Sequence, residues 1–226
     1  MSDTVTILTS STGHSMSKAF IGESYVSNKF NPGTTFTDSE VTVKDLDSLA
    51  VLLRSLAPEP TKTIIRGKSI SDARGVVNRT KDQFRPAKRQ WCMIDIDSLD
   101  WDGDIHDQKA MLSYAIQQLP IEFQAVDCWY HFSSSMGIKS GIRVHLWFWL
   151  DRPCFDDEMK AWLSGYPVDL RLFNPIQIQL TANPRFIDGA VDPYPNRSGL
   201  FSAASGVSTV RVPSDLATRS TAIQAL

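Results

Sequence analysis

Apolar and polar side chains alternate most regularly from residue 91 onward. There the alternation predicts four strands, because successive side chains of a strand point to opposite faces. Two stretches with apolar residues every three or four positions predict amphipathic helices between the strands. In chain order these elements are strand Trp91–Asp97, helix Gln108–Gln118, strand Ala125–Phe132, strand Ile142–Leu150, helix Asp156–Leu163 and strand Ile176–Thr181.

The order of these elements, β-α-β-β-α-β, indicates the fold class. It predicts an α+β fold with an open-faced, RRM-like (βαββαβ) sheet, in which both helices cover one face and the other face is open. We expect this module to span residues 91–200. Residues 201–226 would then form a C-terminal tail or linker.

The pattern over residues 1–90 predicts an N-terminal α/β part that packs against that module. Its clearest element is a helix over Asp45–Leu56, with leucines at helical spacing and Pro58 just after its end. A short strand follows at Thr61–Arg66, and Ser69–Arg89 predicts a loop-rich connection. The first forty residues are rich in Ser, Thr, Gly and Asn, and predict irregular structure with one or two short strands.

The composition is that of a globular protein with a core. Of 226 residues, 42% are hydrophobic and 21% are charged, which excludes a disordered chain. Cys92, Cys128 and Cys154 are widely spaced, so they predict neither a disulfide framework nor a zinc site and fit a reducing, cytoplasmic compartment. The sequence shows no secretory leader and no apolar run of about 18–20 residues, so we expect no membrane association.

The formal net charge is −2, but the charges are distributed unevenly. Six aspartates lie between residues 95 and 107, directly after a basic segment. This juxtaposition suits a phosphate-bearing polymer held beside a metal site, although a solvated basic surface would explain any single residue equally well. The basic side chains of the segment are Lys62, Arg66, Lys68, Arg74, Arg79, Lys81, Arg85, Lys88 and Arg89.

Asp95 and Asp97 lie on one face of the first strand after residue 90, two positions apart. Their side chains are then roughly 6.5–7 Å apart, where two like charges repel by about 2–3 kcal/mol at an effective dielectric near 20. Mg²⁺ or Mn²⁺ would offset that repulsion, because hard cations prefer carboxylate oxygens. The alternative is a pair on an edge strand that simply faces water, so the pair needs partners.

The strand Ile142–Leu150 offers such partners. In a βαββαβ sheet the first and third strands are central neighbours, which would bring His145 close to Asp95 and Asp97. One face of this strand is wholly apolar, and the other holds Arg143, His145, Trp147 and Trp149. The two tryptophans either stack on bases or belong to a core or an interface.

A third carboxylate is also expected, because two-metal phosphoryl chemistry gathers several acidic ligands around cations about 3.5–4 Å apart. Asp169, which follows Val168 just before the last predicted strand, is our choice. Asp188 and Asp192 are rivals, but both lie in a Gly/Pro-rich stretch where turn chemistry is the ordinary explanation.

Short hydroxyls and cations flank the start of the histidine strand. They predict a rim that binds a triphosphate, and a plain hairpin turn would explain the serines equally well. The residues of this rim are Ser133, Ser134, Ser135, Lys139 and Arg143.

Three motifs follow one another along the chain: a strand ending in Asp95-x-Asp97, an Arg-Val-His that carries His145, and Val168-Asp169 before Asn174-Pro175-Ile176-Gln177. In this order, they resemble the motifs of archaeo-eukaryotic-type primases and primase-polymerases, the AEP superfamily. The likeness spans about residues 61–200 and is closest to versions carried by plasmids, phages and integrated mobile elements.

The resemblance implies a nucleotidyltransferase that makes primers on single-stranded DNA from ribo- or deoxynucleoside triphosphates. It implies that Asp95, Asp97 and Asp169 hold two metal ions, Mg²⁺ or Mn²⁺, and that His145 contacts the phosphates of the incoming nucleotide. The basic segment would carry the template. Many relatives also have a Cys/His zinc cluster or a Gly-rich phosphate loop, which this sequence lacks. We therefore expect a replicative helicase to act as a partner, in the same polypeptide or as a separate protein.

Two other classes of protein use open-faced sheets. A replication-initiator or relaxase nuclease binds its metal on His-x-His, whereas His145 is flanked at the alternate positions by Arg143 and Trp147. A non-catalytic module that binds single strands would carry aromatic residues where the first strand carries Asp95 and Asp97. Both remain alternatives to the primase interpretation.

Overall fold

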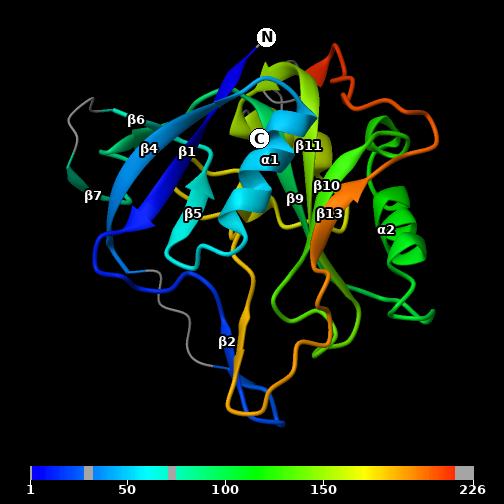
Figure 1. Cartoon of the computed structure of the whole chain (residues 1–226). Coiled ribbons are helices and arrows are strands. Elements are labelled where there is room, and N and C mark those ends of the chain that lie inside the picture. Colours follow the sequence, from blue (N-terminus) through cyan, green and yellow to red (C-terminus); the bar gives the residue numbers. More distant parts are fainter. Residues whose placement is uncertain (1, 28–32, 71–74, 217–226) are drawn as a thin grey trace.

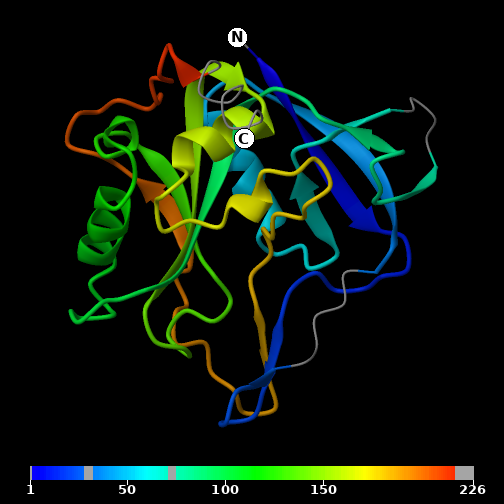
Figure 2. The ribbon, with the colours of Figure 1, turned by 180° about the vertical axis from the view of Figure 1, so that it is seen from behind.

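A four-stranded antiparallel sheet lies at the centre of the fold, with its strands in the order β13-β10-β11-β9. The computed structural model describes residues 2–27, 33–70 and 75–216, which form an α+β fold (Figures 1 and 2). The strands of the central sheet are β9 (Arg89–Leu99), β10 (Cys128–Phe132), β11 (Ile142–Cys154) and β13 (Ser198–Phe201).

The N-terminal part forms a second antiparallel sheet, in the order β5-β1-β4-β7. The prediction of irregular structure with short strands is therefore wrong in extent, because two of these strands are long. The strands are β1 (Asp3–Ser10), β4 (Thr35–Val43), β5 (Lys62–Ile65) and β7 (Val76–Asn78). Two small sheets pair β6 (Lys68–Ser69) with β8 (Phe84–Arg85), and β2 (Ala19–Ile21) with both β3 (Val26–Ser27) and β12 (Arg185–Ile187).

The helices begin and end close to the predicted residues. Asp45 caps the first helix, since its carboxylate accepts the backbone N–H of Ser48 at 2.8 Å. Asp107 caps the second in the same way. The helices are α1 (Leu46–Leu56), α2 (Gln108–Gln117) and α3 (Asp156–Leu163), with single 3-10 turns at Ile121–Phe123 and Leu170–Leu172.

The two faces of the central sheet pack against different parts of the chain. One face is wholly apolar and packs against α2 and α3, as the sequence predicted. The other packs against α1 and the N-terminal sheet over half of its length. Figure 1 shows α1 in front of the sheet, and Figure 2, the view from behind, shows α3 in front of the opposite face. The side chains of this second core that come from the central sheet are Trp91, Met93, Trp129, Trp147 and Trp149.

The prediction of an open face is wrong for that half of the sheet. Trp147 and Trp149 are only 1% and 4% exposed. Each large aromatic side chain left in water would forgo a few kcal/mol of hydrophobic stabilisation, so the N-terminal part covers them. The sequence had left open whether these tryptophans stack on bases or form a core, and the structure places them in a core.

The pairing of β9 with β11 confirms the central prediction from the sequence. The two strands are antiparallel neighbours, and Asp95 lies directly opposite His145. The predicted last strand, Ile176–Thr181, is wrong. This segment makes one isolated bridge, in which Gln179 pairs with Ile64 of the N-terminal sheet, and β13 takes the fourth place, beside β10.

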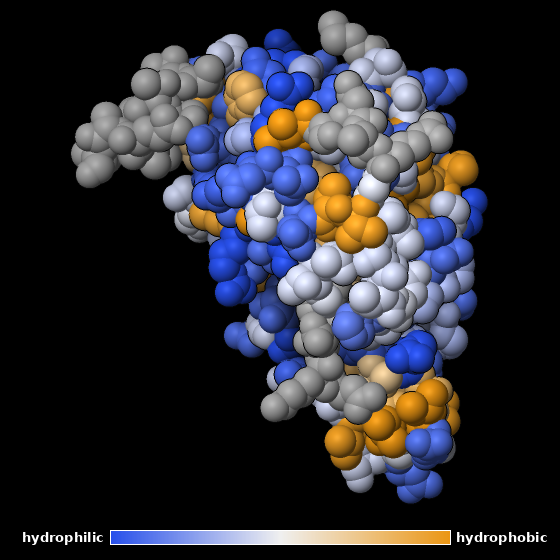
Figure 3. Space-filling view, turned by 90° about the vertical axis from the view of Figure 1, so that its left-hand side faces the viewer, coloured by the Kyte–Doolittle hydropathy of each residue, from blue (hydrophilic) through white to orange (hydrophobic). Residues whose placement is uncertain are grey.

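The lower end of the molecule, as seen in Figure 1, is a narrow extension that contains β2. Figure 3 shows apolar surface gathered at this end. Aromatic stacking holds the extension together, because the ring centroids of Phe20 and Phe186 are 5.4 Å apart. Val26, Ile187 and Val191 are exposed there. Within the described ranges, no helix is long and apolar enough to cross a membrane.

Candidate functional site

A cavity of about 210 Å³ opens where the cover over the central sheet ends. Apart from the candidates for the third carboxylate, it contains every residue that the sequence assigned to the metal and triphosphate sites. Its far wall comes from the N-terminal part of the chain and from the segment after α3. The lining residues are Met16, Ser17, Lys18, Asp95, Asp97, His131, Ser133, Ser134, Ser135, Lys139, Arg143, His145, Leu180 and Ala182.

Asp95 and His145 form the centre of this cavity. Across the β9–β11 pair, His145 Nε2 lies 3.6 Å from Asp95 Oδ1. Burial raises the pKa of the Asp95 carboxyl; His145 opposes this rise, and the charges of Asp97 and Asp169 add to it. His145 Nδ1 is buried without a hydrogen-bond partner in the described part of the chain. A partly buried carboxylate beside a histidine with an unpaired ring nitrogen is typical of a functional site.

Asp97 lies at a bulge in β9. Between Ile96 and Leu99, two residues of β9 oppose the single residue Arg143 of β11, and Ser98 takes a positive φ of 66° there. Arg143 donates to the carboxylate of Asp97 through Nη1 and to the hydroxyl of Ser98 through Nη2. The bulge thus turns Asp97 outward, with its side chain 62% exposed and paired with a cation.

Asp169 lies beside Asp95 through a backbone contact. Its N–H donates to the carbonyl of Asp95 at 3.0 Å, directly before the 3-10 turn Leu170–Leu172. Its carboxylate caps that turn and pairs with Arg171 at 2.8 Å. The hydrogen bonds from Arg171 hold the pKa of Asp169 below its ordinary value. Asp169 therefore adjoins the cavity without being one of its lining residues.

The carboxylate oxygens of the three aspartates suit a hard divalent cation, but arginines engage two of them, Asp97 and Asp169. No group of three His, Cys, Asp or Glu side chains within the described ranges is close enough to hold a metal ion. Two observations nevertheless favour a cation here: the charges of Asp97 and Asp169 both act on the partly buried Asp95, and a backbone hydrogen bond joins Asp169 to Asp95. A cation would relieve this repulsion if Arg143 and Arg171 turned away.

The predicted rim surrounds the same cavity. Ser134, Ser135, Lys139 and Arg143 all line it, with Ser133. Gly141 allows the hairpin to enter β11 close to β9, because a Cβ at this position would lie 2.9 Å from the carbonyl oxygen of Leu99.

The sequence interpretation missed His131 and Lys18. His131 lies on β10 directly opposite His145, with the ring centroids 6.1 Å apart, and its Nε2 bonds to Asn183 Oδ1 at 2.9 Å. Burial lowers the pKa of His131 to about 3, so the ring is neutral. Alternation along Ala125–Phe132 together with the hairpin register could have found His131. No local signal could have found Lys18, which arrives from the N-terminal part.

The rival carboxylates lie elsewhere. Asp188 is an exposed turn residue with a φ of 52°, after β12. Asp192 pairs with Arg197 at 2.5 Å and accepts the backbone N–H of Tyr194 at 2.8 Å. Neither lines the cavity. Both lie in turns, as their Gly/Pro-rich context indicates, and Asp192 also forms an ion pair.

The basic segment is only partly available to a polymer. Arg66 and Arg89 are 0% and 2% exposed and donate to backbone carbonyls in the interior, so their assignment to a template surface is wrong. Lys62 pairs with Glu59 at 3.4 Å, and Arg79 donates to the carbonyl of Ile176. The exposed members are Lys68, Lys81, Arg85 and Lys88, while Arg74 lies outside the described residues.

Comparison with known proteins gives one relevant likeness. No protein-family model matches the chain, and no solved structure matches it. The chain is 24% identical over 177 residues to a protein of Escherichia phage T5 named "Putative replication origin binding protein". That match covers 67% of this chain and 18% of the phage protein, so the chain spans less than a fifth of that relative's length.

Proposed function

We propose that this chain is the catalytic domain of a DNA primase or primase-polymerase of the AEP type, acting in the replication of a phage, plasmid or other mobile element. One observation carries the proposal. Asp95, Asp97, Arg143 and His145 line a single cavity together with the hydroxyls and lysine expected of a triphosphate site. These residues come from two strands that lie about fifty positions apart in the sequence, which makes a chance grouping of turn residues a poor explanation.

The arrangement of the sheet supports an RRM-like module. Its first three strands lie in the order β9-β11-β10, so that the first and third are neighbours, and α2 and α3 cover the same face. The fourth strand differs, since β13 pairs with β10 rather than with β9. We therefore infer an RRM-like core of three strands and two helices, with β13 added as an edge strand beside β10.

The proposed reaction joins a nucleotide to a growing primer on single-stranded DNA. The 3′-hydroxyl oxygen attacks the α-phosphorus of a nucleoside triphosphate, the bond between the α- and β-phosphates breaks, pyrophosphate leaves, and the hydroxyl proton passes to solvent. Arg143, Lys139 and His145 would bind the triphosphate, with Ser134 and Ser135 donating further hydrogen bonds.

Asp95, Asp97 and Asp169 would hold the Mg²⁺ or Mn²⁺ ions. When bound, such ions lower the pKa of the attacking hydroxyl and neutralise charge on the triphosphate and pyrophosphate. Arg143 would then exchange Asp97 for a phosphate oxygen. This exchange keeps its charge paired in both states, which is favourable for a side chain only 11% exposed.

A second candidate function is an origin-binding module without synthesis, favoured by the name of the phage protein. Both candidates require binding to replication DNA, and they differ in whether triphosphates are used. A nuclease of the relaxase kind is less well supported. His131 and His145 do form a cross-strand pair, but His131 Nε2 is already bonded to Asn183.

The test is primer synthesis without an added primer. We would incubate the protein with single-stranded DNA, labelled ribo- or deoxynucleoside triphosphates and Mg²⁺ or Mn²⁺, and resolve the labelled products by length. The proposal expects new oligonucleotides that disappear in Asp95→Asn/Asp97→Asn. The matched control is Asp188→Asn, the same chemical change on an exposed turn outside the cavity. Binding without synthesis would favour the origin-binding candidate, and cleavage of the template would favour the nuclease.

A further inference from the structure

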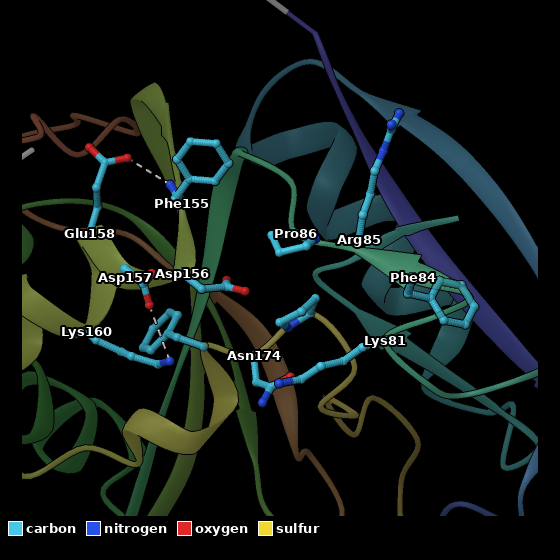
Figure 4. A pocket seen from close by; sticks show the side chains of 12 residues that line it. Lys81, Phe84, Arg85, Pro86, Phe155, Asp156, Asp157, Glu158, Lys160 and Asn174 are labelled. Atoms are coloured by element: carbon cyan, nitrogen blue, oxygen red, sulfur yellow. Dashed lines mark hydrogen bonds and ion pairs between the residues drawn. The ribbon is translucent and has the colours of Figure 1, made fainter. Parts of the chain in front are cut away.

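A second, larger cavity of about 570 Å³ lies between β8 and α3. Its volume is within the ~300–1,000 Å³ range of ligand sites. Phe84, Phe155 and Phe173 supply aromatic walls, and Figure 4 shows Lys81 and Arg85 on the β8 side with Asp156 between them and Phe155. It shares no lining residue with the Asp95 cavity.

Asp156 gives this cavity an unused acceptor. The residue is only 6% exposed, and its Oδ1 accepts from Arg66 Nε at 2.5 Å, while Oδ2 has no hydrogen-bond partner in the described part of the chain. Arg66 is itself fixed by the carbonyls of Trp91 and Cys154, at 2.7 and 3.1 Å. The carboxylate is thus held in the cavity wall by Arg66, with one buried oxygen left without a hydrogen bond.

The other acidic residues of the wall are already engaged. Glu158 accepts from Arg152 at 2.8 Å and from the backbone N–H of Phe155 at 2.9 Å, and Asp157 pairs with Lys160 at 3.6 Å. Figure 4 shows Glu158 turned away from the centre of the cavity. The acidic first turn of α3 therefore does not repel an anion at the rim as strongly as its sequence suggests.

Exposed cations of the basic segment converge here. Lys81 and Arg85 line the cavity, and Lys88 lies 5.0 Å from the centroid of the Phe155 ring. With Arg66 and Arg89 buried, these three are most of what the described part of the segment can offer to a phosphate backbone. Aromatic side chains beside cations are the combination that binds single-stranded nucleic acid.

We propose that this cavity binds one unpaired nucleotide of single-stranded DNA. The base stacks on Phe155 and donates an N–H to Asp156 Oδ2, and its phosphates contact Lys81 and Arg85. Every DNA base has an N–H at its pairing edge, so the site tolerates any sequence. This inference rests on the proposed function in one respect, that the chain handles single-stranded DNA.

The chain itself links this site to the first cavity. Residues 169–182 begin at Asp169, beside Asp95, pass Phe173, Asn174 and Pro175 in the wall of the second cavity, and reach Leu180 and Ala182 in the wall of the first. A strand held in the second cavity therefore contacts the same segment that closes the proposed catalytic cavity.

The experiment measures binding without metal ions or triphosphates, so it does not depend on catalysis. The probes are fluorescently labelled 12-nucleotide DNA strands of mixed sequence and the same strands with abasic sugars, with fluorescence anisotropy as the readout. We expect the unmodified strand to bind at least fivefold more tightly than the abasic one. Phe155→Ala should remove most of this preference, since loss of one stacked base costs about tenfold.

Lys81→Ala/Arg85→Ala should weaken binding of both strands by at least tenfold and reduce the salt dependence of the binding constant. Two matched controls lie elsewhere on the surface: Tyr166→Ala removes an exposed aromatic residue, and Lys109→Ala/Arg211→Ala removes two exposed charges. We expect both controls to bind like the parent protein. Asp156→Asn is avoided because it would disturb the buried partner of Arg66.

Binding that is equal for normal and abasic strands, or unaffected by Phe155→Ala and Lys81→Ala/Arg85→Ala, would overturn the inference. A protein that shows this dependence on the cavity yet makes no primers would retain the inference and refute the proposed function. A protein that makes primers while the variants bind like the parent would retain the proposed function and refute the inference. If the parent protein does not bind the strands at all, both fall.

Discussion

The face of the central sheet opposite α2 and α3 has two halves of different character, one apolar and covered, the other polar and lining a cavity. Along β9 and β11, Trp91, Met93, Trp147 and Trp149 lie under α1 and the N-terminal sheet, and two residues further along the same strands Asp95 and His145 line a polar cavity. The strands and the alternation are continuous across the boundary. What changes is the cover, because α1 and the N-terminal sheet pack directly on the strands in one half and leave a cavity over the other.

The pairing of β9 with β11 therefore has a different consequence in each half. In the covered half, strand pairing brings large apolar surfaces together and contributes stability. In the other half it brings a carboxylate, a histidine and an arginine together at a cost in repulsion and desolvation. We therefore expect substitutions in the two halves to separate folding from activity, and the following predictions are ordered by the size of the expected effect.

The largest effect should follow Asp95→Asn. If the cavity is catalytic, primer synthesis should fall by at least 100-fold, because this carboxylate cannot be replaced as a metal ligand by a neutral amide. The melting temperature should stay the same or rise, since the substitution removes a partly buried charge that two nearby carboxylates repel. Synthesis assays and differential scanning calorimetry on the same preparation test this. A large loss of stability would contradict the division between the halves.

Trp147→Ala should have the opposite profile. This side chain is 1% exposed in the covered half, so its loss should lower the free energy of unfolding by about 3–5 kcal/mol. Denaturant titration followed by circular dichroism measures the change. The control is Leu200→Ala on the edge strand β13. The Leu200 side chain is 44% exposed, so its loss should change stability by less than about 1 kcal/mol. Equal losses in both variants would remove the distinction between core and edge.

His131 lies at the boundary and should make stability depend on pH. Its folded pKa is about 3 and its unfolded pKa is about 6.5, so on acidification the unfolded chain takes up a proton that the folded chain refuses. The free energy of unfolding should fall as the pH drops from about 6.5 toward 3, by up to ~1.4 kcal/mol per pH unit from this group. In His131→Gln this contribution should vanish, which denaturant titrations at several pH values would detect.

The smallest effect concerns Arg171. Its side chain is 87% exposed and holds the Asp169 carboxylate. Arg171→Ala should leave the melting temperature almost unchanged, because exposed ion pairs contribute little. It should tighten Mn²⁺ binding severalfold if Asp169 is a ligand, which isothermal titration calorimetry would measure. Unchanged affinity would instead assign Asp169 the plain role of capping its 3-10 turn.

Strand periodicity predicted the contents of the cavity but not its boundary. Alternation along residues 142–150 was enough to put Arg143 and His145 on one face, and the element order placed that face beside Asp95. The bulge that turns Asp97 outward was not predictable, because it depends on how β11 enters against Ser98. Asp169 was named from its place before the last predicted strand, and its contact with Asp95 depends on a loop.

The N-terminal part shows why the rest was missed. β1 has threonines at three of its positions and looks polar in the sequence, yet Thr6 is 0% exposed, and its hydroxyl donates to the carbonyl of Gly67 and accepts from Arg89. A buried threonine or arginine with all of its hydrogen bonds formed inside looks, in a sequence, like one that faces water. The same ambiguity made Arg66 and Arg89 resemble template contacts.

Each outer carboxylate of the site brings its own counter-ion, Arg143 for Asp97 and Arg171 for Asp169. A polypeptide arranged in this way can complete its folding before any metal arrives. If the site binds divalent ions as proposed, they would enter a finished protein by exchange with two guanidinium groups. The supply of divalent ions in the cell would accordingly govern when such a protein works and leave the amount of folded protein unchanged.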